Sequence, residues 1–163
     1  MSRKYSKGMR SARASPTDSS QVKESFRRQR IMKHIGARIS KLDRGLVEIS
    51  ATNRIQLSQQ DGFVHAGVLV SLADSAGGYA TLSLLPEGSR VLSVELKMNF
   101  LRPAIGEVIR ARGRVKKIGK TLAVCELDTA TRERGVWTTC AWGSQTVYCI
   151  RPVRGSHDVR ERG

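Results

Sequence analysis

The stretch "GFVHAGVLVSLADSAGGYATLSLLP", residues 62–86, decides the fold of this chain. Between His65 and Glu87 its single charged side chain is Asp74, which stands among leucine, valine, alanine and glycine. A carboxylate without a partner is costly in apolar surroundings. The segment therefore raises two questions: what structure it forms, and what Asp74 does inside it.

The apolar character of this segment predicts a central helix over about residues 66–85, which Pro86 ends. Because this helix has no polar face, the rest of the domain must wrap around it. Its small residues, at positions 75–78, lower helix propensity. We expect them where another backbone or a ligand comes close.

Most of the remaining chain is typical of strands. In "VLSVELKMNF" the alternation predicts one apolar face, made of Leu92, Val94, Leu96, Met98 and Phe100. Residues 107–117, 121–131 and 136–150 form three further strand-like runs joined by short turns, which predicts an antiparallel meander. Upstream, two short alternating runs around Asp43-Arg44-Gly45 predict a hairpin.

The ends of the chain differ from this middle part. Residues 1–19 are polar and charged, and predict a disordered basic tail. Residues 20–150 form the expected domain, and residues 151–163 a second basic tail. The domain begins with a predicted helix over about residues 20–35, which has a thin apolar face and ends at Gly36; that face consists of Val22, Phe26 and Ile31.

Composition excludes several classes of protein. No apolar run is long enough for a membrane span, and no secretory signal opens the chain. The three cysteines form no CxxC or Cys/His cluster, so we expect neither disulfides nor a metal site, and a cytoplasmic location. An organelle transit peptide is the weaker alternative for the Arg- and Ser-rich start.

The net charge of +15 invites a nucleic-acid interpretation, but its distribution argues against one. Residues 1–44 hold thirteen basic against three acidic side chains, whereas residues 45–150 carry a net +3 and residues 151–163 a net +2. Most of the charge thus precedes the folded part. A solvated arm accounts for it, and nucleic acid is not expected as the main partner.

Together these patterns predict an α+β fold in which a curved antiparallel sheet wraps around one almost wholly apolar helix. A single sheet of this kind has unpaired edges, which invite pairing with a second copy of the chain.

The quoted helix segment, followed by "SVELKMNFLRPAIGEVIRARGRVKKIGKTLAVCELDT", resembles the hotdog-fold thioesterases of the PaaI-like group. The resemblance covers residues 37–149. It implies hydrolysis of an acyl-coenzyme A thioester without any cofactor, in a homodimer or a dimer-of-dimers homotetramer. It also implies active sites at the subunit interface.

Carried over position by position, the resemblance implies six site residues: Asp74, His65, Ala66, Gly67, Gln59 and Ser93. Asp74 matches the family's catalytic carboxylate and His65 the signature histidine before the helix. Ala66 departs from the family's usual glycine, but it keeps the backbone N–H that points at the thioester carbonyl. Ser93 matches a hydroxyl that helps place water, and Gln59 a common Asn or Gln position.

The chemistry needs a donor for the oxyanion and a group that attacks or activates water. The N–H groups of Ala66 and Gly67 at the helix N-terminus supply the first, and Asp74 supplies the second as general base or as nucleophile. Nine residues separate His65 from Asp74, roughly 13.5 Å along a helix. Asp74 is therefore expected to work with the helix N-terminus of a neighbouring subunit.

Cations are expected around the phosphates of coenzyme A, with Arg102, Lys120 and, more weakly, Arg90 as candidates. Each is equally an ordinary surface cation. Among the aromatics, Tyr79, Trp137 and Trp142 either line an acyl pocket or pack in the core.

Alternatives remain open at this stage. Asp74 also fits a buried ion pair, His65 a residue that orients the loop, and Ser93 simple packing. A different class of function is a hotdog module that binds acyl-coenzyme A without hydrolysing it, with a basic tail attracting nucleic acid. A hotdog hydratase would need a second acid near His65, which the sequence lacks.

Overall fold

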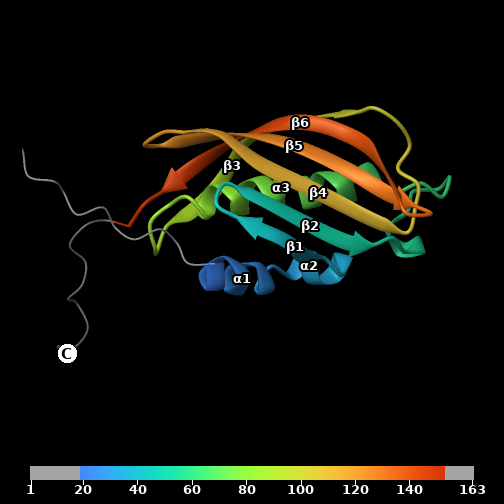
Figure 1. Ribbon diagram of the computed structural model, residues 1–163, viewed down its shortest axis with the longest axis horizontal. Coiled ribbons are helices and arrows are strands. Elements are labelled where there is room, and N and C mark those ends of the chain that lie inside the picture. The colour runs from blue at the N-terminus through green and yellow to red at the C-terminus, as the bar shows by residue number, and fades with distance from the viewer. Residues whose placement is uncertain (1–18, 153–163) are drawn as a thin grey trace, which may run out of the picture.

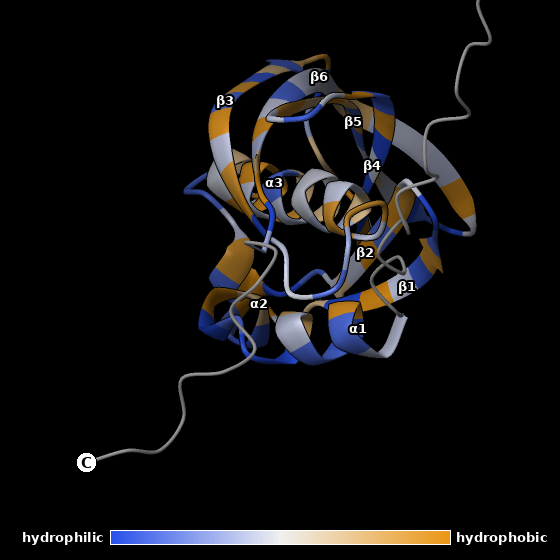
Figure 2. Cartoon of the chain, turned by 90° about the vertical axis from the view of Figure 1, so that its left-hand side faces the viewer, coloured by the Kyte–Doolittle hydropathy of each residue, from blue (hydrophilic) through white to orange (hydrophobic). Residues whose placement is uncertain are grey.

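The computed structural model describes residues 19–152. One antiparallel sheet curves around the central helix α3 (Ala66–Leu82), as Figure 1 shows. The helices α1 (Ser19–Arg27) and α2 (Arg30–Ile35) pack across the side of α3 that the sheet leaves uncovered (Figure 2). The strands are β1 (Arg38–Asp43), β2 (Leu46–Thr52), β3 (Arg90–Phe100), β4 (Val108–Ile118), β5 (Leu122–Glu133) and β6 (Val136–Ile150); a short 3-10 helix, η1, spans Ile55–Leu57. The predicted α+β architecture is confirmed.

The six strands are ordered β1-β2-β4-β5-β6-β3. The predicted hairpin is β1 and β2, and the predicted meander is β4, β5 and β6. The strand β3 precedes the meander in sequence but pairs with its last member, β6. It therefore forms one edge of the sheet, and its second side has no strand partner within residues 19–152.

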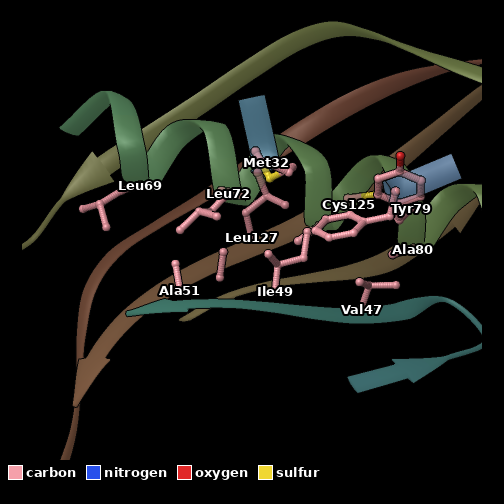
Figure 3. Packing of buried hydrophobic residues seen from close by; sticks show 14 of the residues in the cluster. Met32, Val47, Ile49, Ala51, Leu69, Leu72, Tyr79, Ala80, Cys125 and Leu127 are labelled. Carbon is pink, nitrogen blue, oxygen red and sulfur yellow. The ribbon is translucent and has the colours of Figure 1, made fainter. Parts of the chain in front are cut away.

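The core lies between α3 and the concave face of the sheet. Figure 3 shows Leu69, Leu72 and Ala80 of α3 above Val47 and Ile49 of β2, and all five side chains are buried. This burial answers the first question about the segment: a helix without a polar face is stable here because strands and helices enclose it.

Helix and sheet come very close at Gly113 of β4. A Cβ atom there would overlap the backbone of Ala76 and Gly77, so only glycine fits. The small residues of α3 thus stand where another backbone comes close, as the sequence predicts for part of this run.

The structure of β3 differs from the predicted alternation of apolar and polar side chains. Its register against β6 shifts between Ser93 and Glu95, where a bulge adds one residue. Because such a shift exchanges the two faces of a strand, the residues before the bulge are inverted. Leu92 is consequently 60% exposed, whereas Ser93 faces α3. Leu96 and Met98, beyond the bulge, pack against the core as predicted, whereas Val94 at the bulge and Phe100 at the end of the strand are 61% and 51% exposed and do not belong to that face.

The single N-terminal helix predicted over residues 20–35 is wrong, since the chain forms α1 and α2 with a break at Arg28 and Gln29. Gln29 adopts an extended conformation with ψ at 106°. The break turns Met32 and Ile35 into the core alongside α1, whereas Ile31, assigned to the apolar face, is 53% exposed. A continuous helix would point these apolar positions in different directions.

The remaining boundaries need small corrections. The helix α3 ends at Leu82, earlier than the predicted residue 85, and turns lead from it to the buried Leu85. Gly36 ends α2 in the left-handed conformation, as expected. The predicted tails fall almost wholly outside the described residues. No helix in the described part is long and apolar enough to cross a membrane.

Candidate active site

The carboxylate of Asp74 is held by two side chains from neighbouring strands. Ser93 of β3 donates its hydroxyl to Oδ1 of Asp74 at 2.5 Å, and Gln145 of β6 donates Nε2 to the same oxygen at 2.7 Å. Oδ2 of Asp74 has no hydrogen-bond partner among residues 19–152, and no arginine or lysine of that range pairs with the carboxylate. One oxygen is therefore fixed and the other is available.

Gln145 is the central member of this cluster, and its side chain is completely buried. Its Nε2 also lies 2.9 Å from the Ser93 hydroxyl and 3.2 Å from the backbone oxygen of Asp74. Its Oε1 is buried without a partner in the described structure, which costs about 1–3 kcal/mol. The hydrogen bonds to the charged carboxylate offset that cost, since bonds to charged groups contribute more than neutral ones.

Asp74 opens onto a cavity of about 1050 Å³, here called the Asp74 cavity. Its lining comes from α1 and the break after it, from α3, from β3 with the loop before it, and from the end of β6. Asp74 and Ser93 both line it, as does Arg90. Asp74 is thus neither locked in an ion pair nor far from a binding space.

The N-terminus of α3 forms a second, separate group. His65 is the N-cap residue, and its Nδ1 accepts a hydrogen bond from the N–H of Gly67 at 2.9 Å. The N–H of Val68 donates to the His65 backbone oxygen at 2.9 Å. The N–H of Ala66 has no partner within the described residues. Of the two predicted oxyanion donors, Gly67 is therefore engaged and Ala66 is free.

Gln59 and Arg102 lie beside this N-terminus, where they line a shallow hollow of about 390 Å³ together with Ala66 and Phe100. We call it the helix-start hollow. The side-chain oxygen of Gln59 accepts from the N–H of Asp61 and so closes the turn before α3. The amide nitrogen of Gln59 has no hydrogen-bond partner among residues 19–152.

The predicted site residues therefore fall into two groups in one chain. Asp74, Ser93 and Arg90 line the Asp74 cavity, whereas Gln59, Ala66 and Arg102 line the helix-start hollow. Lys120, in the turn between β4 and β5, lines neither. Among the aromatics Tyr79 lines the Asp74 cavity, whereas Trp137 and Trp142 of β6 line neither and are 38% and 49% exposed.

Gln145 was missed by the sequence reasoning, although one signal could have found it. It stands at an inward position of β6, between the buried Gly143 and Val147. A glutamine at such a position must have hydrogen-bond partners, because an unpaired buried amide is costly. The contribution of α1 to the cavity had no comparable signal.

Comparisons with known proteins agree with this arrangement. The family model of the thioesterase superfamily matches residues 61–137. A putative esterase from Saccharolobus solfataricus is 33% identical over 111 residues, covering 67% of this chain and 72% of the relative. The acyl-coenzyme A thioesterase PaaI of Escherichia coli is 28% identical over 103 residues, 63% of this chain and 71% of that protein.

A crystal structure of a thioesterase family protein from Silicibacter pomeroyi superimposes with a TM-score of 0.80 at 40% identity; the match covers 82% of this chain and 98% of that one. The chain therefore belongs to the thioesterase superfamily. Within it, it is a thioester hydrolase of the PaaI-like group with the hotdog fold.

Proposed function

We propose that this protein hydrolyses acyl-coenzyme A thioesters, with Asp74 as the general base or nucleophile. The observation that carries the proposal is the Asp74 carboxylate itself: Ser93 and Gln145 hold Oδ1, and the free Oδ2 belongs to a residue that lines a large cavity. The relation to PaaI of Escherichia coli, an acyl-coenzyme A thioesterase, supports the substrate class.

In the general-base route, Asp74 removes a proton from a water molecule whose oxygen attacks the thioester carbon. Negative charge then forms on the carbonyl oxygen, which accepts a hydrogen bond from the free N–H of Ala66. The C–S bond breaks, and the coenzyme A sulfur leaves with the proton that Asp74 received. In the nucleophilic route, Oδ2 attacks the carbon, the thiolate leaves first, and water opens the mixed anhydride.

One chain cannot bring both groups to the same carbonyl. Eight residues separate Ala66 from Asp74 in α3, about 12 Å along the helix axis. The Ala66 donor must therefore come from a second subunit. The edge strand β3 supports such a dimer, because its second edge has no strand partner within residues 19–152 and its side chains Leu92 and Val94 are exposed, at 60% and 61%.

The basic residue Arg102 lies at the helix-start hollow, close to where the thioester carbonyl would be bound. We propose it as a contact for the phosphates of coenzyme A, for which a guanidinium is well suited. Arg90 lines the Asp74 cavity, so in this proposal it lies near the acyl group and not near the phosphates of coenzyme A. The reaction uses water, a carboxylate and a backbone donor, and needs no cofactor.

The test combines two variants, each of which removes one group. Asp74→Asn removes the base, and Ala66→Pro removes the backbone donor. Proline is well tolerated at the first position of a helix, and His65 before it is already extended, with φ −63° and ψ 135°. Each homodimer should lose at least about 10²-fold in kcat on a generic acyl-coenzyme A.

A heterodimer of the two variants, purified through two different tags, contains one site with both native groups. It should recover about half of the wild-type turnover per dimer, since a two-fold dimer has two equivalent sites. Near-native turnover of Asp74→Asn would defeat the assignment of Asp74. Failure of the heterodimer to recover would defeat the shared site.

A further inference from the structure

The Asp74 cavity follows one face of α3 away from the carboxylate. Asp74, Gly78 and Leu82 all line it, and they succeed one another at a spacing of four residues. Residues at this spacing lie on the same side of a helix, one turn apart. The cavity therefore extends for about two turns of α3, roughly 12 Å, beginning at Asp74.

Gly78 stands in the middle of that face and keeps it open. A Cβ atom at Gly78 would meet only Cγ2 of Val91, at 3.8 Å, which is ordinary contact. No left-handed conformation requires glycine there either, since Gly78 lies inside α3 and has no positive φ. Glycine in a helix interior costs up to about 1 kcal/mol relative to alanine. Neither packing nor backbone geometry accounts for that cost, whereas an open cavity does.

Polar side chains line the Asp74 cavity as well. They are Ser25 of α1, Arg28 in the break after α1, and Tyr79 of α3. The hydroxyls of Ser25 and Tyr79 are 3.4 Å apart, near the outer limit for a hydrogen bond. Arg28 has no carboxylate partner among the described residues, in contrast to Arg27, which pairs with Glu24 at 3.0 Å. The guanidinium of Arg28 therefore has donors for a further partner, and the long contact between Ser25 and Tyr79 can be exchanged for a contact with a ligand.

The charge states of these groups suit a polar ligand. Burial raises the pKa of the Tyr79 hydroxyl above its ordinary value, although Ser25, Arg28 and Gln29 oppose the shift. Tyr79 therefore remains a protonated donor at neutral pH, beside the guanidinium of Arg28. Tyr79 and Arg28 both favour a ligand that ends in a hydroxyl or a carboxylate over one that ends in a methyl group. A methyl group would displace water from these two polar groups without replacing its hydrogen bonds.

We propose that the acyl group lies along the Asp74, Gly78 and Leu82 face of α3 beneath α1, in the space that Gly78 leaves open, and that its far end carries a hydroxyl or carboxylate bound by Tyr79 and Arg28. Gly78 then sets the width of the acyl site, and Tyr79 and Arg28 select for a polar end. The inference deepens the proposed hydrolysis and rests on it for the position of the thioester at Asp74.

The first experiment tests the polar end with three acyl-coenzyme A esters of equal length: hexanoyl, 6-hydroxyhexanoyl and adipyl. Wild-type kcat/KM should be about tenfold or more higher for at least one polar ester than for hexanoyl, the equivalent of one net hydrogen bond. Tyr79→Phe should reduce the preference for 6-hydroxyhexanoyl over hexanoyl, and Arg28→Ala should reduce the preference for adipyl over hexanoyl. Lys23→Ala is the matched control, since Lys23 is an exposed cation of α1 that does not line the cavity.

The second experiment tests the width. Gly78→Leu should lower kcat/KM for all three six-carbon esters by about 10²-fold relative to acetyl-coenzyme A, because a leucine side chain would occupy the cavity. Gly78→Ala should give a smaller shift in the same direction. Circular dichroism checks that both variants are folded. A change in kcat/KM for the six-carbon esters relative to acetyl-coenzyme A then reflects the acyl site and not misfolding.

Binding of the non-hydrolysable S-hexyl and S-(6-hydroxyhexyl) thioethers of coenzyme A, measured by calorimetry, separates this inference from the hydrolysis proposal. If Asp74→Asn keeps full turnover while Gly78→Leu still abolishes thioether binding, the hydrolysis proposal fails and the acyl site stands. If hexanoyl is the best ester and Arg28→Ala and Tyr79→Phe change nothing, the polar end is overturned. If Gly78→Leu leaves kcat/KM for the six-carbon esters unchanged relative to acetyl-coenzyme A, the assignment of Gly78 is overturned.

Discussion

Gly77 and Gly78 are adjacent in α3, yet the helix turns them toward two different surroundings. Gly77 faces the sheet, where a Cβ atom would overlap Oε1 of Gln145 and come within 2.9 Å of Leu127 Cδ2. Gly78 faces the Asp74 cavity, where a Cβ atom would make only an ordinary contact with Val91 Cγ2 at 3.8 Å. The first glycine permits close packing behind the carboxylate, and the second leaves room in front of it. Identical residues can thus serve opposite purposes on two sides of one helix.

The largest effect that this comparison predicts is at the packed side. Gly77→Ala should lower the free energy of unfolding by about 2 kcal/mol, since overpacking outweighs the gain in helix propensity. It should also reduce turnover, because Gln145 must move away from Asp74. Urea denaturation and steady-state kinetics measure the two effects. A variant as stable as the wild type would show that Gln145 can shift without cost.

Gln145 itself offers a sharper test of the packed side. Gln145→Met keeps the approximate volume but removes the donor to Asp74, and should lower kcat by about 10–100-fold, the value of a hydrogen bond to a charged group. Its KM should change less than about twofold, because Gln145 lines neither cavity.

Stability distinguishes positioning from structural support in that variant. The unpaired Oε1 disappears together with the donor, so the free energy of unfolding should stay within about 1 kcal/mol of the wild type. A large loss of stability with unchanged kcat would contradict the positioning role of Gln145.

The smallest effect has the opposite sign and lies on the open side. Gly78→Ala should raise the free energy of unfolding by about 0.5–1 kcal/mol, because alanine is the better helix former and its methyl group meets no obstacle. The same urea experiment measures it, with Gly77→Ala as the matched comparison. If both variants were destabilised equally, the two sides of α3 would not differ as described.

Much of the fold was predictable because its signals are local. The apolar helix, the hairpin around Gly45 and the strands of the meander follow from side-chain periods of 3.6 and 2 along the chain. Asp74 stood out for a similar reason, as one charge in an apolar segment. The separation of Asp74 from the helix N-terminus also followed from the rise of a helix alone.

The errors occurred where distant segments decide the local structure. The bulge in β3, which turns Ser93 toward Asp74, depends on how β3 pairs with β6, and the alternation of its own residues concealed it. The break at Gln29 likewise depends on α3, because Ser75 donates a hydrogen bond to the Gln29 side chain at 3.1 Å. Neither partner is near in sequence.

By itself, the sequence determined that one apolar helix would be enclosed by antiparallel strands and would carry a single carboxylate too far from its own N-terminus to work with it. Only the tertiary structure decided that Gln145 and Ser93 hold that carboxylate, and that Gly78 and α1 shape the space before it. The physical reason is that periodicity depends on neighbours along the chain. Strand register and helix packing depend instead on contacts between residues that the chain brings together only when it folds.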